Sequence, residues 1–448
     1  MEQIRAAAQS KTFHNTSAVH LGPESRPART LGKFVKIANL RHGPLLPNIS
    51  SCFFSFQHGV FVMTDSQRTC LADIADYFGS LEDPRCHINR HHPLTSVVVI
   101  AIMAILAGAK GPTGIAKWAR SKKEFLCQGL PLPYGVPRKD VFRIVLSLLN
   151  PDVFQACFTQ WLQSLKLEAM EKLNLERPIF GIDGKTLRRS HDHAKGVGAL
   201  HSVSVWASEL GLSLGQVACA EKSNEITAIP ELLRLVDITG AIITIDAMGT
   251  QKAIAKQIVD GNADWVFALK GNQEKLHNEV INYIGKQLEN DFADVDARQH
   301  IVTETLHGRT ETRIYTQMPV PQDLPMLDEW AGLKSIGTAV RCYEVDGNEM
   351  IDIRYYISSL PVGVKLFARA VRRHWGIENS CHWTLDMTFR EDESRIRGQK
   401  IRENFAWLNR LALSLLKQHP SNDSIAMKRQ ICGWDEDFLL EVLTGITL

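Results

Sequence analysis

Three carboxylates are the side chains of this sequence best suited, by type and surroundings, to do chemistry. Asp183 and Asp246 each follow an apolar, strand-like run, and Glu378 lies in a helix-like run of basic and aromatic residues, 372–383. Cleavage of a phosphodiester by two metal ions needs hard oxygen ligands, room for water and phosphate, and a frame holding the metals about 4 Å apart. Two aspartates from neighbouring strands and a glutamate from a helix meet that need, so we expect one metal site that acts on DNA.

Each aspartate also has a purely structural interpretation. A carboxylate at the end of a buried strand costs desolvation free energy unless a positive group meets it. Asp183 could instead cap a turn before Gly184, and Asp246 could cap the helix that follows it. Taken singly, the two aspartates leave both interpretations open.

The spacing around Glu378 adds two histidines to the candidate site. His374, Glu378 and His382 are four residues apart, so on an α-helix they share one face. The histidines could ligate a transition metal, or they could bind phosphate or orient the glutamate. We favour the second role, because the two aspartates already offer hard ligands to Mg²⁺. Trp375 and Trp383 are interpreted as core packing.

Positive residues cluster beside each carboxylate. The clusters are Lys185, Arg188 and Arg189 after Asp183; Lys270, Asn272 and Gln273 after a predicted strand, 265–269; Arg372 and Arg373 before Glu378; and Arg390, Arg395, Arg397 and Lys400 after it. A solvated surface would explain any one cluster, but their shared placement suits a DNA backbone lying over the site. Residues 108–114 lack the spacing and the preceding strand of a phosphate-binding loop, so no nucleotide cofactor is expected.

The composition limits the class of protein. The 448 residues suffice for two or three domains. A formal net charge of only +2 means that DNA binding would depend on local patches. Nine scattered cysteines without paired spacing indicate free thiols in a reducing cytosol. No export signal opens the chain, and the most apolar run, 97–109, predicts a buried helix rather than a membrane span, which takes about twenty residues.

The N-terminal part divides into two regions. Residues 1–62 lack a sustained period, which indicates a poorly ordered basic extension. Met63 stands directly before the cap-like Thr64, so translation could begin there and leave the extension untranslated. A helical domain that could bind DNA follows at 63–170, with helices expected at 71–78, 94–109, 114–126, 139–149 and 151–165. Within it, residues 86–92 are interpreted as a basic loop facing DNA rather than a zinc site, since no second ligand pair follows at zinc spacing.

Residues 175–418 carry the pattern of an α/β domain. The expected order is strands 180–183, 201–207 and 212–220, helix 225–236, strand 241–246, helix 250–259 and strand 265–269, which is the order of a ribonuclease-H-like fold. After a helix at 274–288, strand-like segments at 300–306, 309–317, 336–345 and 349–358 indicate a β-rich insertion at about 290–359. Helical patterns resume at 364–385 and 403–417, and residues 419–448 form a short tail.

Six segments of the chain, in this order, resemble one known family. The segments 182–188, 221–226, 244–252, 269–273, 307–309 and 373–379 together resemble the H-repeat-associated group of bacterial insertion-sequence transposases, which belongs to the DDE class. The resemblance runs from residue 71 to the tail and leaves 1–62 outside. It implies a ribonuclease-H-like catalytic core with a β-rich insertion, preceded by a helical N-terminal domain.

The resemblance also implies roles for particular residues. Asp183, Asp246 and Glu378 would form the DDE triad and bind two Mg²⁺ or Mn²⁺ ions, one activating water and later a 3′-hydroxyl, the other stabilising the leaving oxygen. The expected DNA contacts are Lys185, Arg188, Lys270, Asn272, His307, Arg309, Arg372, Arg373, His374, Arg390, Arg395 and Arg397. Related transposases often carry a Tyr, Arg, Glu and Lys signature around the last carboxylate. Here Val371, His374 and Leu385 replace three of those four residues, which leaves the roles of Arg372, Arg373 and Arg390 open.

The expected function is that of a DDE transposase, which cuts at the ends of its own element by phosphodiester hydrolysis and joins them to target DNA by transesterification. Its partners would be double-stranded DNA carrying terminal inverted repeats, target DNA and, by analogy, a second copy of the chain, at a bacterial nucleoid in the cytoplasm. Two alternatives are a transposase-derived DNA-binding protein that no longer catalyses and a metal-dependent nuclease without strand transfer.

Overall fold

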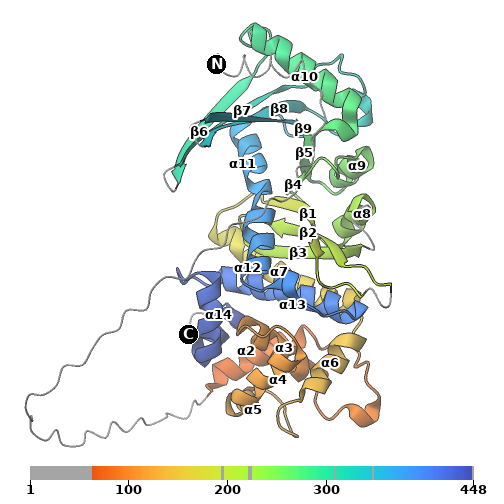
Figure 1. The fold of residues 1–448 in the computed structure, drawn as a ribbon, viewed down its shortest axis with the longest axis vertical. Coiled ribbons are helices and arrows are strands. Elements are labelled where there is room, and N and C mark those ends of the chain that lie inside the picture. Colours follow the sequence, from red (N-terminus) through yellow and green to blue (C-terminus); the bar gives the residue numbers. More distant parts are fainter. Residues whose placement is uncertain (1–62, 193–195, 220–224, 307–308, 346–347, 446–448) are drawn as a thin grey trace, which may run out of the picture. The chain divides into compact units, whose positions relative to one another are not determined.

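One mixed β-sheet of nine strands organises the structure, a computed structural model that describes residues 63–192, 196–219, 225–306, 309–345 and 348–445. The strand order is β3-β2-β1-β4-β5-β9-β8-β7-β6 (Figure 1). The strands are β1 Ile179–Leu187, β2 Leu200–Ala207, β3 Leu212–Cys219, β4 Ile242–Ile245, β5 Asp264–Leu269, β6 Arg298–Leu306, β7 Arg309–Pro319, β8 Ser335–Val345 and β9 Asn348–Ser358. β1, β4 and β5 are parallel, and the remaining pairs are antiparallel. The predicted extension, 1–62, lies outside the described residues.

The β-rich insertion continues the core sheet. β9 pairs antiparallel with β5, with Tyr355 opposite Leu269, and β8, β7 and β6 follow it outward. The ribonuclease-H-like order of strands and helices, the insertion and the preceding helical region are therefore all observed. Residues 346–347, between β8 and β9, fall outside the described residues.

Helices cover both faces of the core strands. α8 Glu225–Leu235 packs on β2 and β3, and α9 Lys252–Asp260 packs on β5 and on α8. On the other face, α11 Val364–His374 crosses β1, β4 and β5 and reaches β6 and β7 (Figure 1). Helix α10 Glu274–Glu289 lies against β9.

Two glycines show which face of β1 each helix covers. A Cβ at Gly181 would lie 3.3 Å from the carbonyl oxygen of His374, the last residue of α11. A Cβ at Gly184 would lie 2.3 Å from Oε1 of Glu225, the first residue of α8. Because alternate residues of a strand point to opposite faces, Asp183 points to the same face as Gly181, the face that α11 covers.

The N-terminal and C-terminal helices share one core. The helices are α2 Asp65–Asp76, α3 Leu94–Leu106, α4 Pro112–Ser121, α5 Lys123–Gly129, α6 Lys139–Leu148 and α7 Pro151–Lys172, with α13 Gln399–Gln418, α14 Ile425–Trp434 and α15 Glu436–Thr444. α13 contacts α3, α6 and α7 as well as β3, so it joins the helical region to the sheet. The predicted C-terminal tail is thus two helices, which pack on α3, whose residues are almost all buried, as predicted.

No single described helix is both long and apolar enough to cross a membrane, although the bent pair α6 and α7 together meets the length and composition for a span. Thr64 caps α2 as predicted, since its hydroxyl accepts the Gln67 N–H. The eight cysteines of the described residues are free.

Four predicted elements have wrong boundaries. β1 continues to Leu187, so Asp183 lies inside a strand and does not cap a turn before Gly184. The segment predicted as one helix at 114–126 is split into α4 and α5, and the helix predicted at 151–165 extends to Lys172. The predicted helix at 364–385 is interrupted after α11 by a π-helical turn, Ile377–His382, before α12 Trp383–Met387.

A buried ion pair fastens the segment after α12 to α13 and predicts a large stability effect. Arg410 lies 3.6 Å from Glu391, with side-chain exposures of 0% and 1%. Truncating Arg410 to Ala strands the carboxylate in the core, so we expect a loss of about 3–5 kcal/mol. Arg390→Ala, which breaks the half-exposed pair with Glu393, should cost at most about 1 kcal/mol. Thermal unfolding of both variants checks this, and equal melting temperatures would contradict it.

Candidate active site

The pairing of β1 with β4 brings the two candidate aspartates together. The strands run parallel with Ile182 opposite Ile245, so the next residue on each, Asp183 and Asp246, come side by side. Neighbouring strands lie about 4.8 Å apart, and side chains at matched positions point to the same face. The two carboxylates therefore share the face of the sheet that α11 covers.

Asp246 caps a turn rather than the helix that it was considered to cap. Its Oδ1 accepts the backbone N–H groups of Met248 at 3.1 Å and Gly249 at 3.3 Å. This capped turn precedes α9, whose own N-cap is Gln251, so Asp246 caps the turn and not the helix. One carboxylate oxygen is thereby fixed, which orients the whole side chain.

Asp183 is buried and has other carboxylates around it. Burial raises the pKa of Asp183 to about 7; a hydrogen bond from the Gly184 N–H opposes the rise, and the negative charges of Glu378 and Asp246 add to it. The charges of the two other predicted carboxylates therefore both reach Asp183. The same pKa is raised further by Glu225, which sequence analysis missed.

Glu378 lies in the π-helical turn between α11 and α12, and it is exposed. The predicted shared face of His374, Glu378 and His382 is not observed, because both histidines contact the sheet while Glu378 faces solvent. In a π-helix the hydrogen bonds run from i to i+5, so residues four apart no longer return to one side. π-turns of this kind recur at functional sites.

Both histidines are held neutral by burial. Nδ1 of His374 lies 3.0 Å from the Thr244 hydroxyl on β4, and Nδ1 of His382 lies 3.5 Å from Asp183 Oδ2. Burial lowers the pKa of His374 to about 4 and that of His382 to about 3. A neutral imidazole offers no positive charge to a phosphate, so the arrangement favours orientation of the site over the phosphate contact expected for His374.

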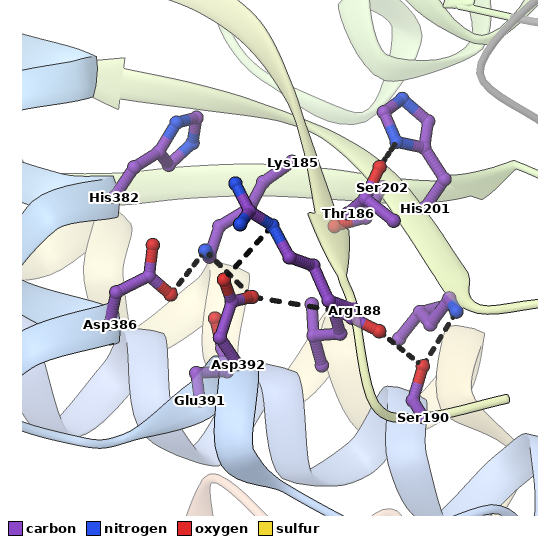
Figure 2. Close-up of polar contacts among 12 residues, drawn as sticks. Lys185, Thr186, Arg188, Ser190, His201, Ser202, His382, Asp386, Glu391 and Asp392 are labelled. Atoms are coloured by element: carbon purple, nitrogen blue, oxygen red, sulfur yellow. Dashed lines mark hydrogen bonds and ion pairs between the residues drawn. The ribbon is translucent and has the colours of Figure 1, made fainter. Parts of the chain in front are cut away.

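Lys185 does not face solvent as a DNA contact would. It is buried, and its ammonium lies 2.5 Å from Asp386 and 3.7 Å from Asp392. Arg188 is exposed and pairs with Asp392 at 3.4 Å. Figure 2 shows the Lys185 ammonium between the two aspartates, with Arg188 on Asp392.

The other predicted DNA contacts take several positions. Exposed Lys270 follows β5, and the amide of Asn272 donates to the carbonyl of Ala247, so this side chain braces the loop after Asp246. Four further arginines are exposed: Arg372 and Arg373, which pair with Glu304 and Glu209, and Arg395 and Arg397 before α13. Arg390 pairs with Glu393. His307 and the side chain of Arg309 lie outside the described residues.

A groove of about 360 Å³ beside Glu378 contains residues that sequence analysis missed. Its lining includes Arg313, Arg341 and Arg354 from the insertion strands. Arg313 and Arg341 pair with Glu311, whereas Arg354 stacks 4.1 Å from the ring centre of Trp375. This contact joins β9 to the residues before Glu378, and nothing in the local sequence pattern signals it.

The three carboxylates suit a hard divalent cation by chemistry. Carboxylate oxygens are the ligands that Mg²⁺ and Mn²⁺ prefer, and a cation there would offset the charge that raises the pKa of Asp183. Among the described residues no three His, Cys, Asp or Glu side chains converge on one point as they stand, the stretch 86–92 included. Exposed Glu378 would therefore have to turn towards the two aspartates.

Comparisons with known proteins point the same way. A family model described as "Transposase DDE domain" matches residues 174–415, and one described as "DDE_Tnp_1-associated" matches 75–162. The chain is 33% identical over 386 residues to the "H repeat-associated putative transposase YhhI" of Escherichia coli K12, covering 84% of this chain and 98% of that protein. It is 37% identical over 380 residues to the "Putative transposase YncI" of E. coli O157:H7, with 84% and 95% covered.

Among solved structures, a cryo-EM structure of the piggyBac transposase synaptic complex with hairpin DNA overlaps 85% of this chain and 78% of that one, at 12% identity and a TM-score of 0.34. That overlap is too loose to match residues. The family model covers more than half of the chain, and the relatives match nearly their whole length. The chain therefore belongs to the DDE transposase family, and it is similar over most of its length to H repeat-associated transposases.

Proposed function

We propose that this chain is the DNA transposase of an insertion sequence, which cuts at the ends of its element and joins those ends to target DNA. Asp183, Asp246 and Glu378 are the carboxylates that carry the reaction. The observation that supports this most directly is the meeting of Asp183 and Asp246 on one face of the sheet, with the pKa of Asp183 raised to about 7 by burial and by the nearby carboxylates, Glu378 among them. Family membership supports the same reading of the site.

Each residue has a distinct task in this proposal. Asp246, fixed by two backbone N–H groups, and Asp183, fixed by its strand, present oxygens at a rigid spacing. Glu378 closes the ligand set from the helix. Mg²⁺ or Mn²⁺, when bound, would activate the attacking water or 3′-hydroxyl and stabilise the leaving oxygen. Two DNA ends must meet for transposition, so a homodimer on DNA is part of the proposal.

The first test uses full-length protein, DNA carrying the inverted repeats that flank its gene, and Mg²⁺ or Mn²⁺. Wild type should nick at the repeat ends and join them to a supplied duplex, and Asp246→Asn should lose both activities by at least about a hundredfold while still binding the ends. Hydrolysis without joined products would favour a nuclease. Specific end binding without cleavage would favour a DNA-binding descendant.

The raised pKa of Asp183 predicts a pH dependence of metal binding. In metal-free protein Asp183 takes up a proton as the pH falls through about 7, and a protonated carboxyl is a poor ligand. Mn²⁺ affinity, measured by calorimetry, should therefore be higher at pH 8 than at pH 6. The same shift affects the stability of the metal-free protein. In the unfolded chain Asp183 loses its proton near pH 3.8, whereas in the folded state it keeps the proton up to about pH 7. The free energy of unfolding should therefore fall as the pH rises from about 3.8 to about 7. In Asp183→Asn both dependences should be smaller.

Lys270 provides a test of the DNA path. It is exposed beside the Asp246 loop, where an ammonium can meet a phosphate. Lys270→Ala should weaken binding to duplex DNA and reduce the slope of log K against log salt by about one unit. An unchanged slope would remove Lys270 from the interface.

A further inference from the structure

Lys185 is a buried cation, and DNA binding does not explain its burial. Only 7% of the residue is exposed, and its ammonium is directed at carboxylates of its own chain. A buried charge is tolerated only when partners offset its desolvation. Its principal partner, Asp386, lies on α12, eight residues after Glu378.

The π-helical turn Ile377–His382 and α12 together form one helical segment, here called the Glu378 helix. The contact of Lys185 with Asp386 is one of two contacts that join this helix to β1. Asp183 and Lys185 are two residues apart on the strand, and their partners, His382 and Asp386, are four apart on the helix. Two strand residues span about 6.6 Å, and four residues of α-helix rise about 6 Å. The two spacings agree, so both links can form together only when the helix lies along β1 in one register.

A third link holds the helix at its other end. His374 contacts Thr244 on β4 at 3.0 Å, before the π-helical turn. The turn that carries Glu378 is therefore held from both sides, by β4 before it and by β1 after it. Of the two links to β1, the Lys185 pair is the shorter, at 2.5 Å against 3.5 Å, and Lys185 is the cation in it.

We propose that Lys185 is a positioning residue, whose ion pair with Asp386 fixes the register of the Glu378 helix on β1 and so sets where Glu378 stands relative to Asp183. The consequence for metal binding rests on the proposed function, but the consequence for the local order of the helix does not. Asp392, which Lys185 shares with Arg188, extends the same link to the segment after α12 (Figure 2).

The test compares Lys185→Met with Lys122→Met in the full-length chain. Lys122 pairs with Glu436 at 2.7 Å and is also largely buried, but this pair joins the helical regions and touches none of the three carboxylates. Three quantities are measured: Mn²⁺ affinity by calorimetry, amide hydrogen exchange, and the salt slope of duplex binding. Lys185→Arg, which keeps the charge, tests for rescue.

Lys185→Met should lower Mn²⁺ affinity about tenfold, the usual size when a group that orients metal ligands is lost. Amide hydrogen exchange of this variant should speed up chiefly within residues 377–387. The salt slope of its binding to duplex DNA should stay unchanged. Lys122→Met should leave Mn²⁺ affinity and that exchange as in wild type, and Lys185→Arg should recover most of the loss.

Two results would overturn the proposal. A shallower salt slope with unchanged Mn²⁺ affinity and exchange would make Lys185 a DNA contact, as the sequence suggested. Faster exchange spread over the whole chain would make the pair a general stabiliser. If wild type itself binds no Mn²⁺, the metal-dependent function fails, and the exchange of residues 377–387 still decides the positioning role.

Discussion

The rest of the site depends on two carboxylates, Asp183 and Asp246, that neighbouring strands hold side by side. The parallel register of β1 and β4 is fixed by buried pairs such as Ile182 and Ile245, and a slip by one residue would turn these side chains out of the core. Asp183 and Asp246 therefore cannot move apart. In the part of the chain that the structure describes, no Lys or Arg forms an ion pair with either. A proton or an added cation must offset their repulsion.

The helix that carries Glu378 fits this constraint through close contacts. Gly181 lets the helix backbone approach β1, and a Cβ at Gly376 would lie 2.7 Å from the Ser208 hydroxyl. That hydroxyl donates to the carbonyl of Arg373, near the end of α11. The helix changes to π geometry immediately after these contacts, which leaves Glu378 exposed although both flanking histidines face the sheet.

Much of this site was visible in the sequence, for identifiable reasons. An apolar run that ends in a carboxylate marked both aspartates, since burial makes such a residue costly without a purpose. The continuation of β1 past Asp183 was not visible, because residues 184–186 are not apolar; the strand continues there by pairing with β2, where Lys185 stands opposite Ser202. Local pattern carries no signal for such pairing.

The links between distant segments were equally hidden. The spacing of His374, Glu378 and His382 allowed a helix to be predicted there, but not its π-helical turn, nor that Lys185 would be the partner of Asp386. The predicted charge clusters assumed that basic residues face solvent. All ten cations of those clusters except Lys185 are exposed. Five of the ten nevertheless pair with carboxylates of the chain, which agrees with a net charge of only +2: Lys185, Arg188, Arg372, Arg373 and Arg390.

The continuous sheet gives the insertion a place in the site. Because β9 pairs with β5, with Tyr355 opposite Leu269, the next residues, Arg354 and Lys270, come side by side. Arg354 then stacks on Trp375, three residues before Glu378. A β-domain joined only by flexible linkers could not hold a guanidinium there. Main-chain hydrogen bonds thus fix the insertion to the core sheet that carries the two aspartates. Residues of the insertion strands also line the groove beside Glu378.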